Sequence, residues 1–93
     1  MPLFILIATD KPNALELRVA TRQAHIDYVR DSGLVKIAGP LLDDAGGMAG
    51  SMLLIEAEDL AAAQAFAAAD PYALAGLFEK VELRPFKLTL GGL

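Results

Sequence analysis

The chain has 93 residues, the length of one small domain, and residues 1–93 are interpreted as a single unit. Hydrophobic residues make up 55% of the sequence, which excludes a disordered chain. The net charge of −4 provides no basic surface for nucleic acid. The sequence has no cysteine, which excludes disulfides and thiol nucleophiles and suits a cytoplasmic location. No apolar run approaches the ~18 residues that span a membrane.

The first third of the chain predicts a strand followed by a long helix. Residues 3–8 form a short, continuous apolar run, which is typical of a central strand buried on both faces and argues against a signal peptide. Asn13 is a favourable N-cap, with Glu16 in the capping-box position. The helical pattern runs over residues 14–32, and Gly33 is suited to end it in the left-handed conformation.

Apolar residues spaced three, four and seven apart predict one buried face on this helix. They are Leu15, Val19, Ile26 and Val29. Arg18, Arg22 and His25 follow one edge of that face, because residues three, four and seven apart lie on the same side of a helix. Two cations and a titratable imidazole are therefore expected beside the core.

Residues 34–42 and 50–57 predict a second and a third strand, and the Asp/Gly-rich residues 43–47 between them predict a turn. The two strands are expected to form an antiparallel hairpin. Gly39-Pro40 predicts a bulge in the second strand or the end of that strand.

The last third predicts a second helix over residues 60–69, capped by Asp59 and rich in alanine, which allows close approach to a sheet. Asp70-Pro71 ends this helix, because the residue before a proline is disfavoured in the α region. Residues 72–77 predict a short helical turn broken at Gly76. Residues 78–90 predict a last strand, with Pro85 at an edge or a bulge, and residues 91–93 a tail.

The order β-α-β-β-α-β predicts an α+β fold of the ferredoxin-like class with a four-stranded antiparallel sheet. Both helices are expected on one face of that sheet, and no further segment of the chain is left to cover the other face. The high hydrophobic content fits a homodimer in which a second copy closes over the open sheet face.

His25, the only histidine, and Asp70 are the candidates for proton transfer. Histidine is the side chain that titrates near neutral pH without help, and a carboxylate orients its ring and stabilises the protonated form. Two structural interpretations stand beside this one. His25 can simply make a buried polar contact, and Asp70 can end the helix by bonding nearby backbone N–H groups.

Three further residues are candidates for binding a ligand. Arg18 can bind an anionic group, Ser51 can donate a hydrogen bond, and Tyr72 can stack on an aromatic ring. Their structural alternatives are a salt bridge with a nearby acid, a polar strand start and a core anchor. Arg22 is interpreted as structural. Metal binding is disfavoured because one histidine and no cysteine leave only carboxylates, and no phosphate-binding loop or other cofactor motif is present.

Several segments together resemble the YciI-like (YCII-related) proteins, a family of small bacterial proteins. The matching segments are the opening strand at residues 3–7, Arg18, His25-Ile26-Asp27-Tyr28, Gly39-Pro40-Leu41, Gly50-Ser51, Asp70-Pro71-Tyr72 and Ala75-Gly76-Leu77-Phe78. The resemblance covers nearly the whole chain and implies a ferredoxin-like dimeric α+β barrel. It also implies a His25–Asp70 pair in a cleft, with contributions from Arg18, Ser51 and Tyr72.

One branch of this family resembles dehydrochlorinases that remove HCl from a chlorinated hydroxyhydroquinone. The leading hypothesis is therefore a cytoplasmic homodimeric enzyme that eliminates or isomerises a small anionic aromatic or carbonyl compound, without a cofactor. The alternative is a non-catalytic dimer that senses a ligand or interacts with another molecule. A third interpretation, a purely structural dimer, predicts no pocket at the edge of the helix that carries His25.

Overall fold

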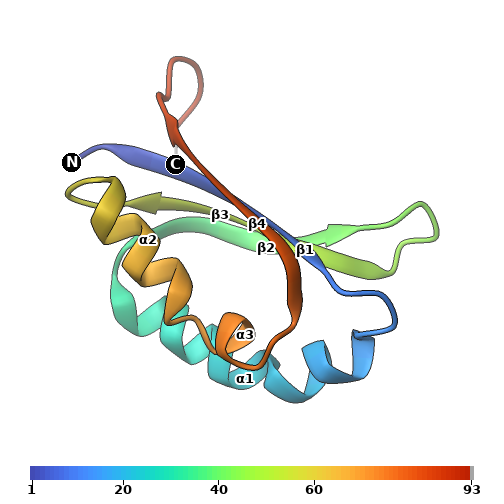
Figure 1. Ribbon diagram of the computed structural model, residues 1–93. Helices are drawn as coiled ribbons and strands as arrows, with labels where there is room; N and C mark the ends of the chain where they lie inside the picture. The colour runs from blue at the N-terminus through green and yellow to red at the C-terminus, as the bar shows by residue number, and fades with distance from the viewer. Residues whose placement is uncertain (93) are drawn as a thin grey trace.

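The computed structural model describes residues 1–92, which form four strands and three helices (Figure 1). The elements are β1 (Leu3–Asp10), α1 (Leu15–Ser32), β2 (Val35–Leu42), β3 (Met48–Glu56), α2 (Leu60–Ala68), α3 (Pro71–Leu74) and β4 (Phe78–Phe86). The predicted β-α-β-β-α-β order is confirmed, and the predicted helical turn after Asp70 forms α3. Position 93 of the predicted tail lies outside the described residues.

The strands form one antiparallel sheet in the order β2-β3-β1-β4, so β1 and β3 are central and β2 and β4 are edges. All three helices lie on the same side of this sheet, which curves around them (Figure 1). The fold is the predicted ferredoxin-like α+β class, and β2 and β3 form the predicted hairpin. None of the helices in residues 1–92 has an apolar stretch long enough to cross a membrane.

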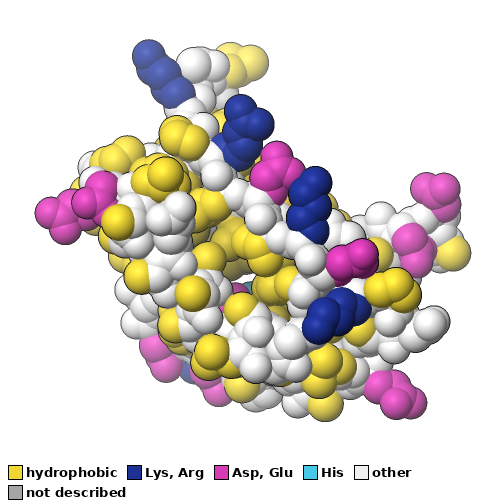
Figure 2. All heavy atoms as spheres, viewed as in Figure 1, with side chains coloured by type: hydrophobic (Ala, Val, Ile, Leu, Met, Phe, Trp, Pro, Cys, Tyr) yellow, Lys and Arg dark blue, Asp and Glu magenta, His cyan; other side chains and the backbone are white. Residues whose placement is uncertain are grey.

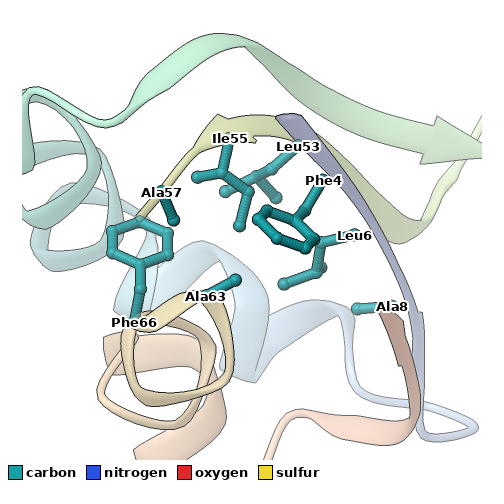
Figure 3. Packing of buried hydrophobic residues seen from close by; sticks show 8 residues of the cluster. All are labelled: Phe4, Leu6, Ala8, Leu53, Ile55, Ala57, Ala63 and Phe66. Atoms are coloured by element: carbon teal, nitrogen blue, oxygen red, sulfur yellow. The ribbon is translucent and has the colours of Figure 1, made fainter. Parts of the chain in front are cut away.

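The hydrophobic core lies between the sheet and the helices, mainly under α2. Alternate residues of β1 and β3 point from the sheet toward Ala63 and Phe66 of α2 (Figure 3). The cluster consists of Phe4, Leu6, Ala8, Leu53, Ile55, Ala57, Ala63 and Phe66. Ala63 has no exposed surface, which confirms that the alanine-rich helix lies close to the sheet.

The other side of the sheet has no covering element among residues 1–92 (Figure 1). Ile5 and Ile7 of β1 alternate with the core residues and therefore point to this side, where Ile7 is 39% exposed. The cross-strand partners of Ile7 are Met52 and Glu82, which share its side of the sheet. Within one copy of the chain, β1 is thus buried on one face only, in contrast to the predicted burial of both faces. Figure 2 shows Lys/Arg and Asp/Glu side chains spaced along β4.

Most of the predicted helix boundaries are confirmed. Gly33 ends α1 in the left-handed conformation with φ 69°, and Asp59 caps α2 by accepting a hydrogen bond from the Ala62 N–H at 2.8 Å. The prediction for Asn13 is wrong, because Ala14 occupies the N-cap position of α1 and no side chain caps it. Asn13 itself has φ 58°, a left-handed turn conformation that asparagine tolerates.

The predicted bulge at Gly39-Pro40 is also wrong. Gly39 pairs with Met52 and Pro40 with Ser51 in continuous register, and the irregularities lie nearer the two ends of β2. An edge strand accommodates proline because one side of it needs no hydrogen-bond donor. On the opposite edge, β4 ends at Phe86 rather than at residue 90, and Pro85 pairs with Phe4 as the edge prediction requires.

The largest correction concerns the orientation of α1. Leu15, Val19 and Ile26 of the predicted apolar face are 52%, 54% and 40% exposed. Arg18 is instead 3% exposed, so the edge that carries Arg18 and His25 faces the sheet. Val29 alone of the four predicted apolar positions packs against the core. The helix therefore presents polar side chains to the interior of the molecule.

Candidate functional site

A cavity of about 310 Å³ lies where α1 faces the sheet and the start of α3. Its lining comes from α1, β2, β3 and α3, so it depends on segments that are far apart in the sequence. The polar lining residues are Arg18, Arg22, His25, Arg30, Ser51 and Tyr72. Four residues predicted for the site, Arg18, His25, Ser51 and Tyr72, thus line the same cavity, and this finding contradicts the purely structural interpretation.

His25, which lines this cavity, forms a direct pair with Asp70. The Nδ1 atom of His25 lies 2.8 and 2.9 Å from the two carboxylate oxygens of Asp70. Their side chains are 12% and 6% exposed. An ionised carboxylate only accepts hydrogen bonds, so Nδ1 carries the hydrogen and Nε2 is the nitrogen left for a ligand. The carboxylate therefore fixes both the tautomer and the orientation of the imidazole.

Asp70 is itself held in place by the local sequence. It is the N-cap of α3, where its Oδ1 accepts a hydrogen bond from the Tyr72 N–H at 2.8 Å. Pro71 occupies the first helical position, where its fixed φ is favourable and its missing N–H costs nothing. Asp70 thus caps a helix and contacts His25 at the same time. The Asp-Pro turn gives the carboxylate a rigid backbone support.

Tyr72 packs against the cationic and aromatic groups of the site. Its ring stacks on His25 with centroids 4.1 Å apart, and the guanidinium carbon of Arg18 lies 4.7 Å from its centre. Phe78 contacts its edge. Tyr72 is 2% exposed, and this burial raises the pKa of its hydroxyl, an effect that the positive charges of Arg18 and Arg22 partly offset. Near neutral pH the hydroxyl is therefore protonated and able to donate a hydrogen bond.

Arg18 forms a buried ion pair that the sequence did not reveal. Its Nε and Nη2 atoms donate to the two oxygens of Asp10 at 2.7 and 2.9 Å, and Nη2 also donates to Ser51 Oγ at 2.8 Å. Burial alone would lower the pKa of Arg18, but the hydrogen bonds and charge of Asp10 outweigh it and raise that pKa. The arginine is thus committed to a protein partner, as its structural alternative predicted.

Asp10 is a site residue that the sequence interpretation missed. It is the last residue of β1, and its side chain is 6% exposed. The available signal was an acid at the end of a strand that leads directly into the helix bearing Arg18. That signal is weak, because acids are common in such loops.

Ser51 lines the cavity from β3, directly after a point where β3 runs very close to β1. A Cβ atom on the preceding residue, Gly50, would lie 2.3 Å from the carbonyl oxygen of Ala8, so only glycine fits there. Ser51 is 2% exposed, and its Oγ accepts the hydrogen bond from Arg18. The hydroxyl hydrogen remains available for a ligand. Within residues 1–92 no three histidine, cysteine or acidic side chains are grouped as metal ligands.

A family model and curated relatives match nearly the whole chain. The model of the YCII-related domain matches residues 2–87. Protein YciI of Escherichia coli O6:H1 is 42% identical, covering 91% of this chain and 96% of the relative. An uncharacterized protein of Haemophilus influenzae is 36% identical, covering 90% and 95%.

Two solved structures extend this comparison. The 5-chloro-2-hydroxyhydroquinone dehydrochlorinase TftG of Burkholderia phenoliruptrix AC1100, in complex with 2,5-dihydroxybenzoquinone, superposes with a TM-score of 0.83. It is 31% identical, covering 91% of this chain and 93% of TftG. An antibiotic biosynthesis monooxygenase, at 14% identity and a TM-score of 0.61, shares the fold alone. On the family match and on both levels of identity, this chain belongs to the YCII-related domain family.

Proposed function

We propose that this protein is a cytoplasmic, homodimeric enzyme whose His25–Asp70 pair transfers a proton during elimination or isomerisation of a small anionic aromatic or carbonyl compound. The observation that carries the proposal is the His25 imidazole, which lines the cavity and is held at Nδ1 by both oxygens of Asp70. A carboxylate-oriented imidazole is the usual arrangement of a general base in enzymes. The similarity to TftG, a dehydrochlorinase, supports elimination as the class of reaction.

In the proposed elimination, Nε2 of His25 takes a proton from a hydroxyl or C–H group of the substrate. From a C–H group next to the C–Cl carbon, the electron pair of the broken bond forms a C=C bond as chloride leaves with the electrons of its bond to carbon. From a hydroxyl on a C=C bond, the electron pair forms C=O, the C=C bond shifts by one position, and chloride leaves from the saturated carbon at its far end, which in a chlorophenol is the carbon of its keto tautomer. Asp70 stabilises the imidazolium through its hydrogen bonds to Nδ1. The imidazolium then returns the proton to solvent. In an isomerisation the same proton is returned to a different atom of the substrate.

Ser51 and Tyr72 are proposed to position the substrate. The Ser51 hydroxyl already accepts from Arg18, so its own hydrogen is free to be donated to a substrate oxygen. The protonated Tyr72 hydroxyl is a second possible donor, and its ring fixes the plane of the imidazole. Arg18 contributes its positive charge and holds Ser51, while its contacts with Asp10 keep it in place.

The test is to incubate the protein in D2O with 5-chloro-2-hydroxyhydroquinone and with a panel of halogenated phenols and lactones. Chloride release and deuterium incorporation are followed against a reaction without protein. For at least one compound we expect chloride release or deuterium exchange well above the background rate. If compounds bind without release or exchange, the ligand-sensing alternative is favoured over the enzyme.

The homodimer is proposed to form through the open side of the sheet. Ile7 and Ile37 are 39% and 44% exposed there, and a second sheet would bury both. Ile7→Glu is expected to raise the dimer dissociation constant at least tenfold, because a charge would be buried without a partner. Val19→Glu on the outer face of α1 is the matched control, since Val19 is more exposed at 54%. Sedimentation velocity over a concentration series measures the dimer dissociation constant of each variant. If the two variants raise it equally, the interface lies elsewhere.

A further inference from the structure

The charged side chains that line the cavity directly are all basic. Arg18, Arg22 and Arg30 line the cavity, whereas no aspartate or glutamate does, although the whole chain is acidic with a net charge of −4. Arg84 is the only other arginine of the sequence. A cavity lined by cations within an acidic protein favours an anionic ligand.

The three arginines differ in how far their charge is already neutralised. Arg18 is paired with Asp10, and Arg30 is paired with Asp27 and Asp31, at 3.0 and 3.3 Å, on the solvent side of α1. Within residues 1–92, no carboxylate lies within salt-bridge distance of Arg22. Arg22 lines the same cavity as Tyr72, and its positive charge acts against the burial that raises the pKa of Tyr72.

The position of Arg22 relates it directly to the proposed base. Arg22 and His25 lie three residues apart on α1, so their Cβ atoms are neighbours on one helix face, about 5–6 Å apart. Arg22 is exposed and therefore lies at the mouth of the cavity, while His25 lies deeper. A ligand bound to both would have its anionic group at the mouth and its reacting atom inside.

The rest of the lining indicates the shape of the remaining ligand. Ile26, Val29, Pro40 and Met48 provide an apolar surface beside the polar groups. An apolar cavity with a few polar groups at fixed positions is typical of a small-molecule site. The guanidinium of arginine is planar and binds two adjacent oxygens at once, which a carboxylate or two neighbouring ring oxygens provide.

We infer that Arg22, and not Arg18, binds the anionic group of the ligand and makes the cavity selective for small aromatic anions with two adjacent oxygens. The inference rests on the proposed function in taking this cavity as the substrate site. It assigns the substrate class of that site. The substrate is a compound with a single ring, whose anionic oxygens bind Arg22 while another atom of the same compound reacts with His25. Arg18 is then a positioning residue, which holds Ser51 and Tyr72.

Binding of two matched probes tests this assignment without requiring turnover. Benzoate and benzamide have the same ring and differ in charge, and NMR titration of the protein with each gives two dissociation constants. The wild-type protein is expected to bind benzoate more tightly than benzamide. Arg22→Gln is expected to weaken benzoate binding roughly tenfold to a hundredfold, the range for a charge-assisted hydrogen bond, with less than a threefold effect on benzamide.

Two further variants sharpen the result. Arg22→Lys keeps the charge but loses the paired donors, so an intermediate loss of benzoate binding is expected. Arg30→Gln removes another arginine from the cavity lining, but Asp27 and Asp31 already neutralise the charge of Arg30. The dissociation constant of benzoate is therefore expected to change less than threefold. The assignment is overturned if the Arg22→Gln variant still binds benzoate more tightly than benzamide. It is also overturned if Arg30→Gln weakens benzoate binding as much as Arg22→Gln does, or if the wild-type protein does not bind benzoate.

The two proposals fail separately. If benzoate binding depends on Arg22 but no compound undergoes chloride release or proton exchange, the anion site stands and the enzyme proposal falls. If turnover is found but Arg22→Gln changes neither binding nor KM, the enzyme proposal stands and Arg22 is not the anion-binding residue.

Discussion

Replacement of His25 by glutamine is expected to lower kcat by about 10²–10⁴-fold on any compound that the protein turns over, because this range is what a general base contributes. Glutamine keeps a polar side chain near Asp70 but accepts no proton at neutral pH. The rate is measured as chloride release or deuterium exchange under substrate saturation. A rate equal to that of the wild type would remove His25 from the chemistry.

Asp70→Asn is the matched variant for the partner of His25. The asparagine oxygen can still accept the Tyr72 N–H bond that begins α3, so the local fold is expected to be retained. The amide no longer stabilises the imidazolium or fixes its tautomer, and kcat is expected to fall by two orders of magnitude or more. The circular dichroism spectrum and the midpoint of thermal unfolding check that the fold is intact. A lost fold with unchanged activity per folded molecule would make Asp70 structural only.

Arg18→Met is expected to destabilise the protein by about 3–5 kcal/mol, because it leaves the buried carboxylate of Asp10 without its partner. The side chains of Arg18 and Asp10 are 3% and 6% exposed, so water cannot replace the lost contacts without opening the structure. Small domains have a total stability of only about 5–15 kcal/mol, so this single change approaches the limit of folding. Urea unfolding followed by circular dichroism gives the free energy of unfolding.

The double variant Arg18→Met with Asp10→Asn separates the buried charge from the lost packing. A neutral amide at position 10 is expected to recover part of the stability, because no ionised group is then left unpaired. The single Asp10→Asn variant completes the cycle and gives the coupling energy between the two residues. A loss below about 1 kcal/mol in Arg18→Met would mean that the ion pair is not what holds α1 on the sheet.

Local patterns were sufficient for the order of the elements and for several of their ends. The left-handed Gly33 and the Asp59 cap each depend on interactions within a few residues. The same holds for Asp70-Pro71, where the backbone restriction of proline and the Asp cap act on neighbouring residues. Asn13 is the exception, since its left-handed conformation moves the N-cap position to Ala14.

The sequence by itself therefore determined the fold class, and the resemblance to a family directed attention to His25 and Asp70. Only the tertiary structure decided which side of α1 faces the sheet, because a helical period shows that a stripe exists and not what lies opposite it. Burial of Arg18 is stable only because Asp10 from the end of β1 and Ser51 from β3 meet it there. That meeting occupies Arg18 with protein partners, a commitment that the helical spacing of Arg18 and His25 could not show.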